Sequence, residues 1–201
     1  MGEEPLALGL RAERSEQVRD KILAAAGELM MEGSLAAVTM EAIAARAGVS
    51  KRTLYKYWPS RGAVALEGFM RRSDAMSAIP EGASAAEALE ALVVAAALLF
   101  TQTPAGPLMR SLVADAQSNE EIANALRDQW LRPRRDATAR VVEQGMASGE
   151  LRPGLDVEVV MDLLFAPVYH RLFFGYGALD VGFAAQVARY AIGGLLAAPA
   201  V

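Results

Sequence analysis

The chain has no cysteine and a single histidine among its 201 residues. Without cysteine it forms no disulfide and no thiolate metal site, and one histidine does not build a zinc centre. Aromatic residues make up 6% of the chain and charged residues 22%, whereas 53% of the residues are hydrophobic. This balance indicates a substantial core, in one large or two small domains. We expect no metal and no cofactor.

Signals for export and for membrane insertion are also lacking. The acidic start, Met1 to Pro5, has neither the basic flank nor the apolar run of a signal peptide. Residues 91–109 are free of charge, but polar residues, Gly106 and two prolines interrupt them and leave an apolar run far shorter than the roughly 20 residues that span a bilayer. We therefore expect a cytoplasmic protein with no membrane span, in which this stretch is a buried helix.

Groups suited to catalysis are scarce. The chain has no glycine-rich phosphate loop, and its carboxylates show no convergent spacing. We therefore expect no enzyme. A helical enzyme that uses carboxylates alone, and a helical ligand-binding or interaction module without DNA activity, remain the alternatives.

The hydrophobic pattern predicts an all-α protein of about nine helices, because no alternating strand pattern competes with the helical period. We expect a flexible tail over residues 1–14, an N-terminal domain over 15–76 and a C-terminal domain over 77–201, with the boundary at a cluster of proline, glycine and serine near residues 79–84. The helices expected in the second domain cover residues 84–102, 105–117, 119–148, 156–174 and 181–198. Pro133 and Pro167 predict kinks inside the long ones.

Residues 39–61 predict a helix-turn-helix. Gly48 lies where one helix must end and the chain must reverse, a position that favours the left-handed conformation of glycine. Thr39 and Ser50 are suited to cap the two helices, and Ala44 is small enough to let them cross closely. The residues left facing outward on the second helix are Lys51, Arg52, Thr53, Tyr55, Lys56 and Tyr57, and we expect Ser50 at its start to bind DNA with them. They carry donors for phosphates and base edges in a major groove, with the tyrosine hydroxyls expected to reach phosphate.

Charge is segregated along the chain. Residues 46–72 hold seven basic residues and one acid, a local charge of +6, whereas the whole chain carries −4 and the remainder therefore −10. A positive region on an acidic body attracts DNA at one face and discourages indiscriminate coating of the polymer. The arrangement supports binding to double-stranded DNA.

The two final helices, residues 156–174 and 181–198, carry more apolar surface than one chain of this size is able to cover. We therefore expect a homodimer in which they form a four-helix bundle with their mates. A fully buried core within one chain is the alternative.

A ligand pocket is expected between the long helices of the second domain. Its candidate lining residues are Phe100, Met109, Leu112, Trp130, Phe165 and Tyr169, with His170 as a hydrogen-bonding group. Each of these is also an ordinary core or structural residue by type. Arg132, Arg134 and Arg135 are suited by type to hold a ligand carboxylate, but they spread around one helix, so we expect them to face water.

The N-terminal residues resemble those of the TetR-like (tetracycline-repressor-like) transcriptional regulators. The resemblance rests on Ile22 to Ala26, Thr39, Ile43-Ala44, Ala47 to Ser50, Thr53 to Tyr55, Tyr57-Trp58 and Ser60-Arg61, and covers about residues 15–70. Residues 149–153, 156–158 and 165–169 resemble one C-terminal subtype of the same family. The resemblance implies a homodimeric repressor that binds a palindromic operator and leaves it when a small-molecule effector enters the C-terminal domain.

The resemblance also implies roles for individual residues. Lys51, Arg52, Tyr55, Lys56 and Tyr57 fall where the family contacts DNA, and Thr39 and Arg61 fall where it grips phosphates at helix starts. Two positions depart from the pattern. Arg52 replaces a frequent glycine and predicts an operator preference of its own, and Gly62 replaces a frequent acidic residue at the start of the helix that transmits the signal.

Overall fold

The protein is seen in a computed structural model that describes residues 3–32, 38–72 and 79–197. Within these ranges the chain is helical and contains no strand, which confirms the predicted all-α class. It divides into two compact units. One holds Met1–Ser73 and Ser111–Ala123, and the other holds Asp74–Arg110 and Asn124–Val201. The sequence predicted a single break at residue 76, whereas the structure also groups residues 111–123 with the N-terminal unit.

The N-terminal unit is built on the crossing of α1 (Glu3–Glu32) and α4 (Arg61–Arg72). The crossing is close because Gly68 of α4 has no side chain. A Cβ there would lie 2.7 Å from the carbonyl oxygen of Leu23 and 3.0 Å from the Cβ of Ala26. Ile22 of α1 and Val64 of α4 are fully buried in this unit. A small residue at the crossing therefore lets two helices share one core.

α1 begins at Glu3, so the structure continues the helix through most of the predicted tail. Residues 3–14 are rich in Leu, Ala, Arg and Glu, which favour helix over the flexible tail that was predicted. The predicted end of the N-terminal domain at residue 76 lies outside the described residues.

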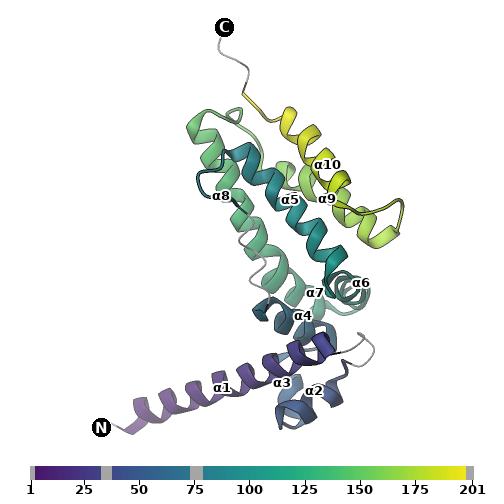
Figure 1. The fold of residues 1–201 in the computed structure, drawn as a ribbon. Helices are drawn as coiled ribbons and strands as arrows, with labels where there is room; N and C mark the ends of the chain where they lie inside the picture. The colour runs from purple at the N-terminus through teal and green to yellow at the C-terminus, as the bar shows by residue number, and fades with distance from the viewer. Residues whose placement is uncertain (1–2, 33–37, 73–78, 198–201) are drawn as a thin grey trace. The chain divides into compact units, whose positions relative to one another are not determined.

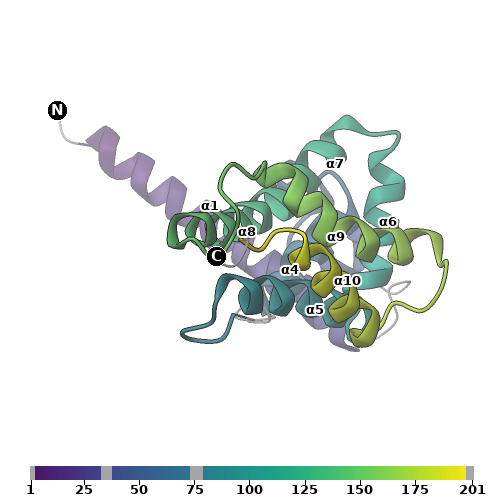
Figure 2. The same ribbon diagram turned by 90° about the horizontal axis from the view of Figure 1, so that it is seen from above.

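The second unit packs α5 (Ala85–Gln102), α8 (Arg132–Ser148), α9 (Val157–Phe174) and α10 (Val181–Gly193) side by side (Figures 1 and 2). α5 is long and apolar enough to cross a membrane by length and composition. It is instead a core helix that contacts α8, α9 and α10, with Leu89, Val93 and Ala97 fully buried. The predicted buried helix is therefore observed.

Glu150 belongs to residues 149–153, the loop after α8 that resembles a C-terminal subtype of the family, and it caps the start of α5. Its two carboxylate oxygens accept hydrogen bonds from the backbone amides of Ala85 and Ala86 at 2.7 and 2.9 Å. Those amides belong to the first turn of α5 and have no partner within the helix. Leu151, the next residue, is fully buried. The loop after α8 thus caps α5 and adds to the same core.

The long helix predicted over residues 119–148 is interrupted rather than simply kinked. α7 (Glu120–Ala125) leads into a π-helical segment, Leu126–Leu131, and then into α8. In this segment the amide of Arg132 donates to the carbonyl oxygen of Arg127, five residues earlier. Pro133 has no N–H and its ring crowds the carbonyl four residues back, which accounts for a wider turn just before it. Pro167, by contrast, lies inside a continuous α9.

Candidate functional site

The helix-turn-helix forms as predicted. Thr39 caps α2 (Met40–Ala47) by accepting a hydrogen bond from the amide of Ala42 at 3.1 Å. Ser50 caps α3 (Lys51–Tyr57) by accepting from the amide of Thr53 at 3.1 Å. Between the two helices Gly48 adopts φ 66° and ψ 35°, the left-handed conformation. The turn that the sequence predicted is therefore the one that reverses the chain.

The apolar residues of the motif hold the two helices together. Ile43, Ala44 and Leu54 are buried, and Trp58, which follows α3, is fully buried. Ala47 and Val49 are half-buried. Burial of this side leaves the opposite side of α3 for solvent or for a partner.

Three predicted DNA-contacting residues, Arg52, Tyr55 and Lys56, are exposed on α3, and the Tyr55 side chain is 53% exposed. Beside them runs an open groove between α1 and α3. The residues that line it are Ser15, Val18, Ser50, Arg52, Thr53, Lys56 and Tyr57. The groove thus brings two residues of α1, which the sequence analysis did not select, to the basic face of α3. In the sequence, Ser15 and Val18 were marked for this site only by their place on the helix that supports the helix-turn-helix.

Lys51 lies on the same face but is ion-paired. Its Nζ is 2.8 Å from Glu41 Oε1 of α2, and both side chains are exposed. The hydrogen bond between them, and then their charge attraction, raise the pKa of Lys51, and the same hydrogen bond lowers the pKa of Glu41. A phosphate that engages Lys51 therefore competes with a carboxylate of the motif itself.

Two further predicted residues have partners inside the unit. The Tyr57 hydroxyl, which was expected to reach phosphate, lies 2.7 Å from Ser15 Oγ of α1 and so joins α3 to α1. The Thr53 hydroxyl lies 2.9 Å from Ser50 Oγ. Arg61 is the first residue of α4 and is exposed. The structure therefore groups Arg52, Tyr55 and Lys56 as the open part of the face.

The packing of Leu112 accounts for a glycine at position 62. A Cβ at Gly62 would lie 3.2 Å from Leu112 Cδ1, so the glycine leaves room for that side chain. Leu112 is buried and belongs to the segment, residues 111–123, that joins the N-terminal unit. An acidic side chain at residue 62 would crowd this contact. The departure from the family pattern is thus matched by a leucine packed on the first turn of α4.

The second unit contains a cavity among α5, α8, α9 and the π-helical segment. It leaves about 80 Å³ for the centres of water-sized molecules. The lining residues are Leu92, Ala95, Ala96, Leu99, Phe100, Trp130, Leu131, Arg134, Arg135, Ala137, Thr138, Met161, Phe165 and Tyr169. Four of the predicted ligand-contacting residues, Phe100, Trp130, Phe165 and Tyr169, are among them.

The aromatic wall of this cavity is a cluster. The Phe100 ring lies 5.6 Å from that of Tyr169 and 6.1 Å from that of Trp130, measured between centroids. The indole nitrogen of Trp130 donates a long hydrogen bond, 3.4 Å, to the Tyr169 hydroxyl. Burial raises the pKa of Tyr169, so the hydroxyl stays protonated at neutral pH. The wall is therefore apolar, with one hydroxyl in it.

Arg134 covers the face of Trp130. Its Cζ lies 3.4 Å from the ring centroid, and its Nη1 donates to the backbone carbonyl of Trp130 at 2.9 Å. Burial lowers the pKa of Arg134 to about 10, so the guanidinium remains charged at neutral pH. The sequence analysis expected Arg134 to face water, which is wrong. The i, i+4 spacing of Trp130 and Arg134 was the available signal.

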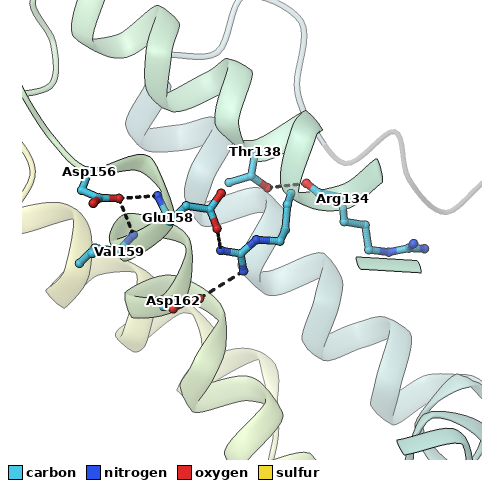
Figure 3. Close-up of polar contacts among 7 residues, drawn as sticks. Arg134, Thr138, Asp156, Glu158, Val159 and Asp162 are labelled. Carbon is cyan, nitrogen blue, oxygen red and sulfur yellow. Dashed lines mark hydrogen bonds and ion pairs between the residues drawn. The ribbon is translucent and has the colours of Figure 1, made fainter. Parts of the chain in front are cut away.

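The neighbouring Arg135 and Arg132 have surroundings unlike those of Arg134. Arg135 also lines the cavity, and it is ion-paired with Glu158 and, at 3.2 Å, with Asp162 of α9. Figure 3 shows Glu158 and Asp162 on one side of α8, and the Arg134 side chain pointing away from both. Arg132 is exposed and lies 3.1 Å from Asp128, as expected for a solvated residue.

Three predicted ligand-contacting residues are not brought to this cavity. Met109 is buried elsewhere in the second unit, and Leu112 packs against Gly62 in the N-terminal unit. His170 is exposed on α9, with its ring 5.2 Å from that of Phe174. In a continuous apolar run the sequence does not show which side of the helix faces the core, and His170 lies on the other side.

Comparison with known proteins agrees with this geometry. The model for bacterial regulatory proteins of the tetR family matches residues 22–67, and the model for the tetracyclin repressor-like C-terminal domain matches residues 79–191. The HTH-type transcriptional regulator YdeS of Bacillus subtilis (strain 168) is 33% identical over 159 residues, which cover 79% of this chain and 80% of that protein.

Solved structures share the fold. The TetR family transcription regulator SCO0332 superposes with a TM-score of 0.78 at 34% identity, over 89% of this chain and 98% of that one. The transcriptional regulator FadR from Bacillus subtilis, in complex with stearoyl-CoA, superposes with a TM-score of 0.62 at 21% identity, over 87% and 98%. With its helix-turn-helix, its basic face and these matches over both units, the chain belongs to the TetR family of DNA-binding transcriptional regulators, which are not enzymes.

Proposed function

We propose that this regulator is a cytoplasmic repressor that binds a palindromic operator as a homodimer and is released from it by a small-molecule effector. The observation that carries the DNA part is the exposed basic side of α3, where Arg52 and Lys56 flank Tyr55 on a helix held from behind by buried Leu54. Such a helix is suited to enter a major groove, with Arg52 reading base edges and Lys56 meeting phosphate.

An apolar stripe on the second unit supports the homodimer. Val159, Leu163 and Phe174 of α9 are 54%, 53% and 76% exposed, and Tyr190 of α10 is 74% exposed. The spacing of Val159, Leu163 and Phe174 puts these three on one side of α9, about 100° around the helix from the buried Val160, Leu164 and Val168. Exposed apolar surface of this kind marks an interaction site. A second copy of the chain is the occupant we propose, through helices α9 and α10.

The cavity lined by Phe100, Trp130 and Tyr169 is the proposed effector site. It is apolar and carries few polar groups, as small-molecule sites do. The FadR structure that shares this fold holds stearoyl-CoA.

DNA selected from a random pool by the full chain, followed by fluorescence anisotropy at 50 and 200 mM salt, tests the proposal. Lys51, Lys56 and Arg61 offer three phosphate partners on each protomer. A dimer that uses them all should lose about 10³ in affinity between the two salt concentrations, because each neutralised phosphate releases condensed counterions. The selected sequence should be an inverted repeat and should bind better than random duplex. Affinity that is absent, or that does not change with salt, contradicts the proposal.

A further inference from the structure

The size and the rings of the cavity in the second unit limit the shape of its ligand. One water needs about 10–15 Å³ for its centre, so about 80 Å³ holds about five to eight waters, or about 150–240 Å³ of liquid. The rings of Tyr169 and Trp130 lie 5.6 and 6.1 Å from that of Phe100, between centroids. Rings at such spacings favour offset or edge-to-face contact with a further ring. The space therefore suits a flat molecule of one substituted ring or two fused rings.

The two arginines that line the cavity already have partners within the protein. Arg135 is ion-paired with Glu158 and Asp162 of α9. Arg134 lies on the ring of Trp130 and donates to its backbone carbonyl at 2.9 Å. Neither guanidinium therefore depends on a ligand for a hydrogen bond.

Among the uncharged polar side chains of the lining, the Tyr169 hydroxyl is the donor left without an acceptor. The indole nitrogen of Trp130 donates to this hydroxyl at 3.4 Å, and the Thr138 hydroxyl donates to the backbone carbonyl of Arg134 at 3.1 Å. The Tyr169 oxygen thus accepts a hydrogen bond, but none of the described residues accepts the proton that it carries. Because burial raises the pKa of Tyr169, this proton is present at neutral pH. A donor withdrawn from water without an acceptor is costly, and an oxygen of a ligand would satisfy it.

We propose that the effector is a flat aromatic molecule with a carbonyl oxygen, which accepts a hydrogen bond from the Tyr169 hydroxyl while the ring lies against Phe100 and Trp130. The proposal rests on the proposed function of the cavity as the effector site and names the chemistry of that ligand. It also makes Tyr169 the residue that selects the ligand. A hydrocarbon of the same shape fills the space but leaves the hydroxyl without an acceptor, and a site of this kind discriminates against such a molecule.

Two uncharged compounds of one shape test the hydroxyl without involving the charges of the arginines. 2-Acetylnaphthalene has a carbonyl oxygen, and 2-isopropenylnaphthalene has a methylene group in its place. Each is titrated by calorimetry into the full chain and into its Tyr169→Phe variant. The variant should bind the ketone about 3–10-fold more weakly, the usual contribution of one hydrogen bond, and should bind the hydrocarbon as tightly as before or more tightly. Equal losses for both compounds, or no binding of the ketone to the unaltered protein, overturns the proposal.

Tyr176→Phe is the matched control, because it removes the same hydroxyl from a tyrosine of this unit that is 80% exposed. It should change neither affinity. Thermal unfolding shows whether Tyr169→Phe is folded.

The infrared carbonyl band of the bound ketone is a second measurement, and it decides the matter on the unaltered protein if Tyr169→Phe does not fold. A hydrogen bond weakens the C=O bond, so the band should lie at lower wavenumber in the protein than in hexane. A band at the hexane position overturns the proposal. A lowered band that persists in a folded Tyr169→Phe also overturns it, because another group is then the donor.

Operator affinity with and without the ketone separates this inference from the proposed function. If DNA binds as proposed but binding of the ketone does not depend on Tyr169, the ligand chemistry is wrong and the regulator remains. If the ketone binds through Tyr169 but no DNA is selected, the operator function is wrong and the ligand chemistry remains.

Discussion

The indole nitrogen of Trp58 donates a hydrogen bond of 2.6 Å to Glu67 Oε2. The other oxygen of this carboxylate accepts from Arg19 Nη2, also at 2.6 Å, and the Arg19 guanidinium lies 5.6 Å from the Trp58 ring. Trp58 directly follows α3, Glu67 is on α4 and Arg19 is on α1. One carboxylate therefore joins the end of the DNA-reading helix to both helices that support it.

Glu67→Ala should lower the free energy of unfolding by about 1–3 kcal/mol, because it leaves the buried indole N–H without its acceptor. Glu67→Gln keeps a carbonyl oxygen and loses only the ion pair with partly exposed Arg19, so it should cost about 0–1 kcal/mol. Urea unfolding followed by circular dichroism measures both. Equal losses for the two variants would show that the hydrogen bond to Trp58 contributes nothing of its own.

Gly48→Ala should destabilise the helix-turn-helix by about 1–2 kcal/mol through backbone strain alone. A Cβ at this position would meet no atom within 4 Å, so the positive φ is the only obstacle. Gly48→Asn should cost less, since asparagine tolerates the left-handed region better. Thermal unfolding of both variants measures the difference, and an alanine variant as stable as the asparagine variant would exclude strain as the cause.

Arg52→Ala should cost about 1–3 kcal/mol in binding to the selected operator and relax base choice at one position, because Arg52 is exposed on α3 where base edges are read. Lys56→Ala should weaken binding to all sequences about equally and reduce the salt slope by about 1. Anisotropy against a set of single-base operator variants distinguishes the two. Uniform losses for Arg52→Ala would remove it from base readout.

Glu41→Gln should raise the affinity for random duplex DNA. The change frees Lys51 from its ion pair and removes a negative charge beside the phosphates. Glu81→Gln, which makes the same change of net charge at an exposed position of the other unit, is the control. The measurement is anisotropy at low salt, where exposed charges are least screened. Equal effects of the two substitutions would mean that net charge alone is responsible.

Leu163→Glu should turn the proposed dimer into monomers, because it puts a charge in the exposed apolar stripe of α9. Operator affinity should then fall by about 100-fold or more, since the two half-sites no longer bind as one unit. Gln144→Glu adds the same charge at an exposed position of α8 and should change neither property. Sedimentation gives the oligomeric state. A dimer that persists in Leu163→Glu places the interface elsewhere.

Within the N-terminal unit, most of the site was predictable because its determinants are local. A cap, a glycine turn and a basic helix follow from a few consecutive residues, and the structure forms them at Thr39, Gly48 and Ser50. What the local pattern did not show were partners from other helices. Ser15 engages the Tyr57 hydroxyl, and Glu67 engages Trp58, across separations of 42 and 9 residues.

By itself the sequence determined the all-α class, the helix-turn-helix and the segregation of positive charge, since these depend on periodicity, capping and composition along a continuous stretch. Only the tertiary structure decided which apolar residues share a cavity. Trp130 and Tyr169 line it and His170 does not, because the rotation of each helix is set by its packing against others. The same packing placed the half-buried guanidinium of Arg134 on an indole, where the sequence alone predicted a residue in water.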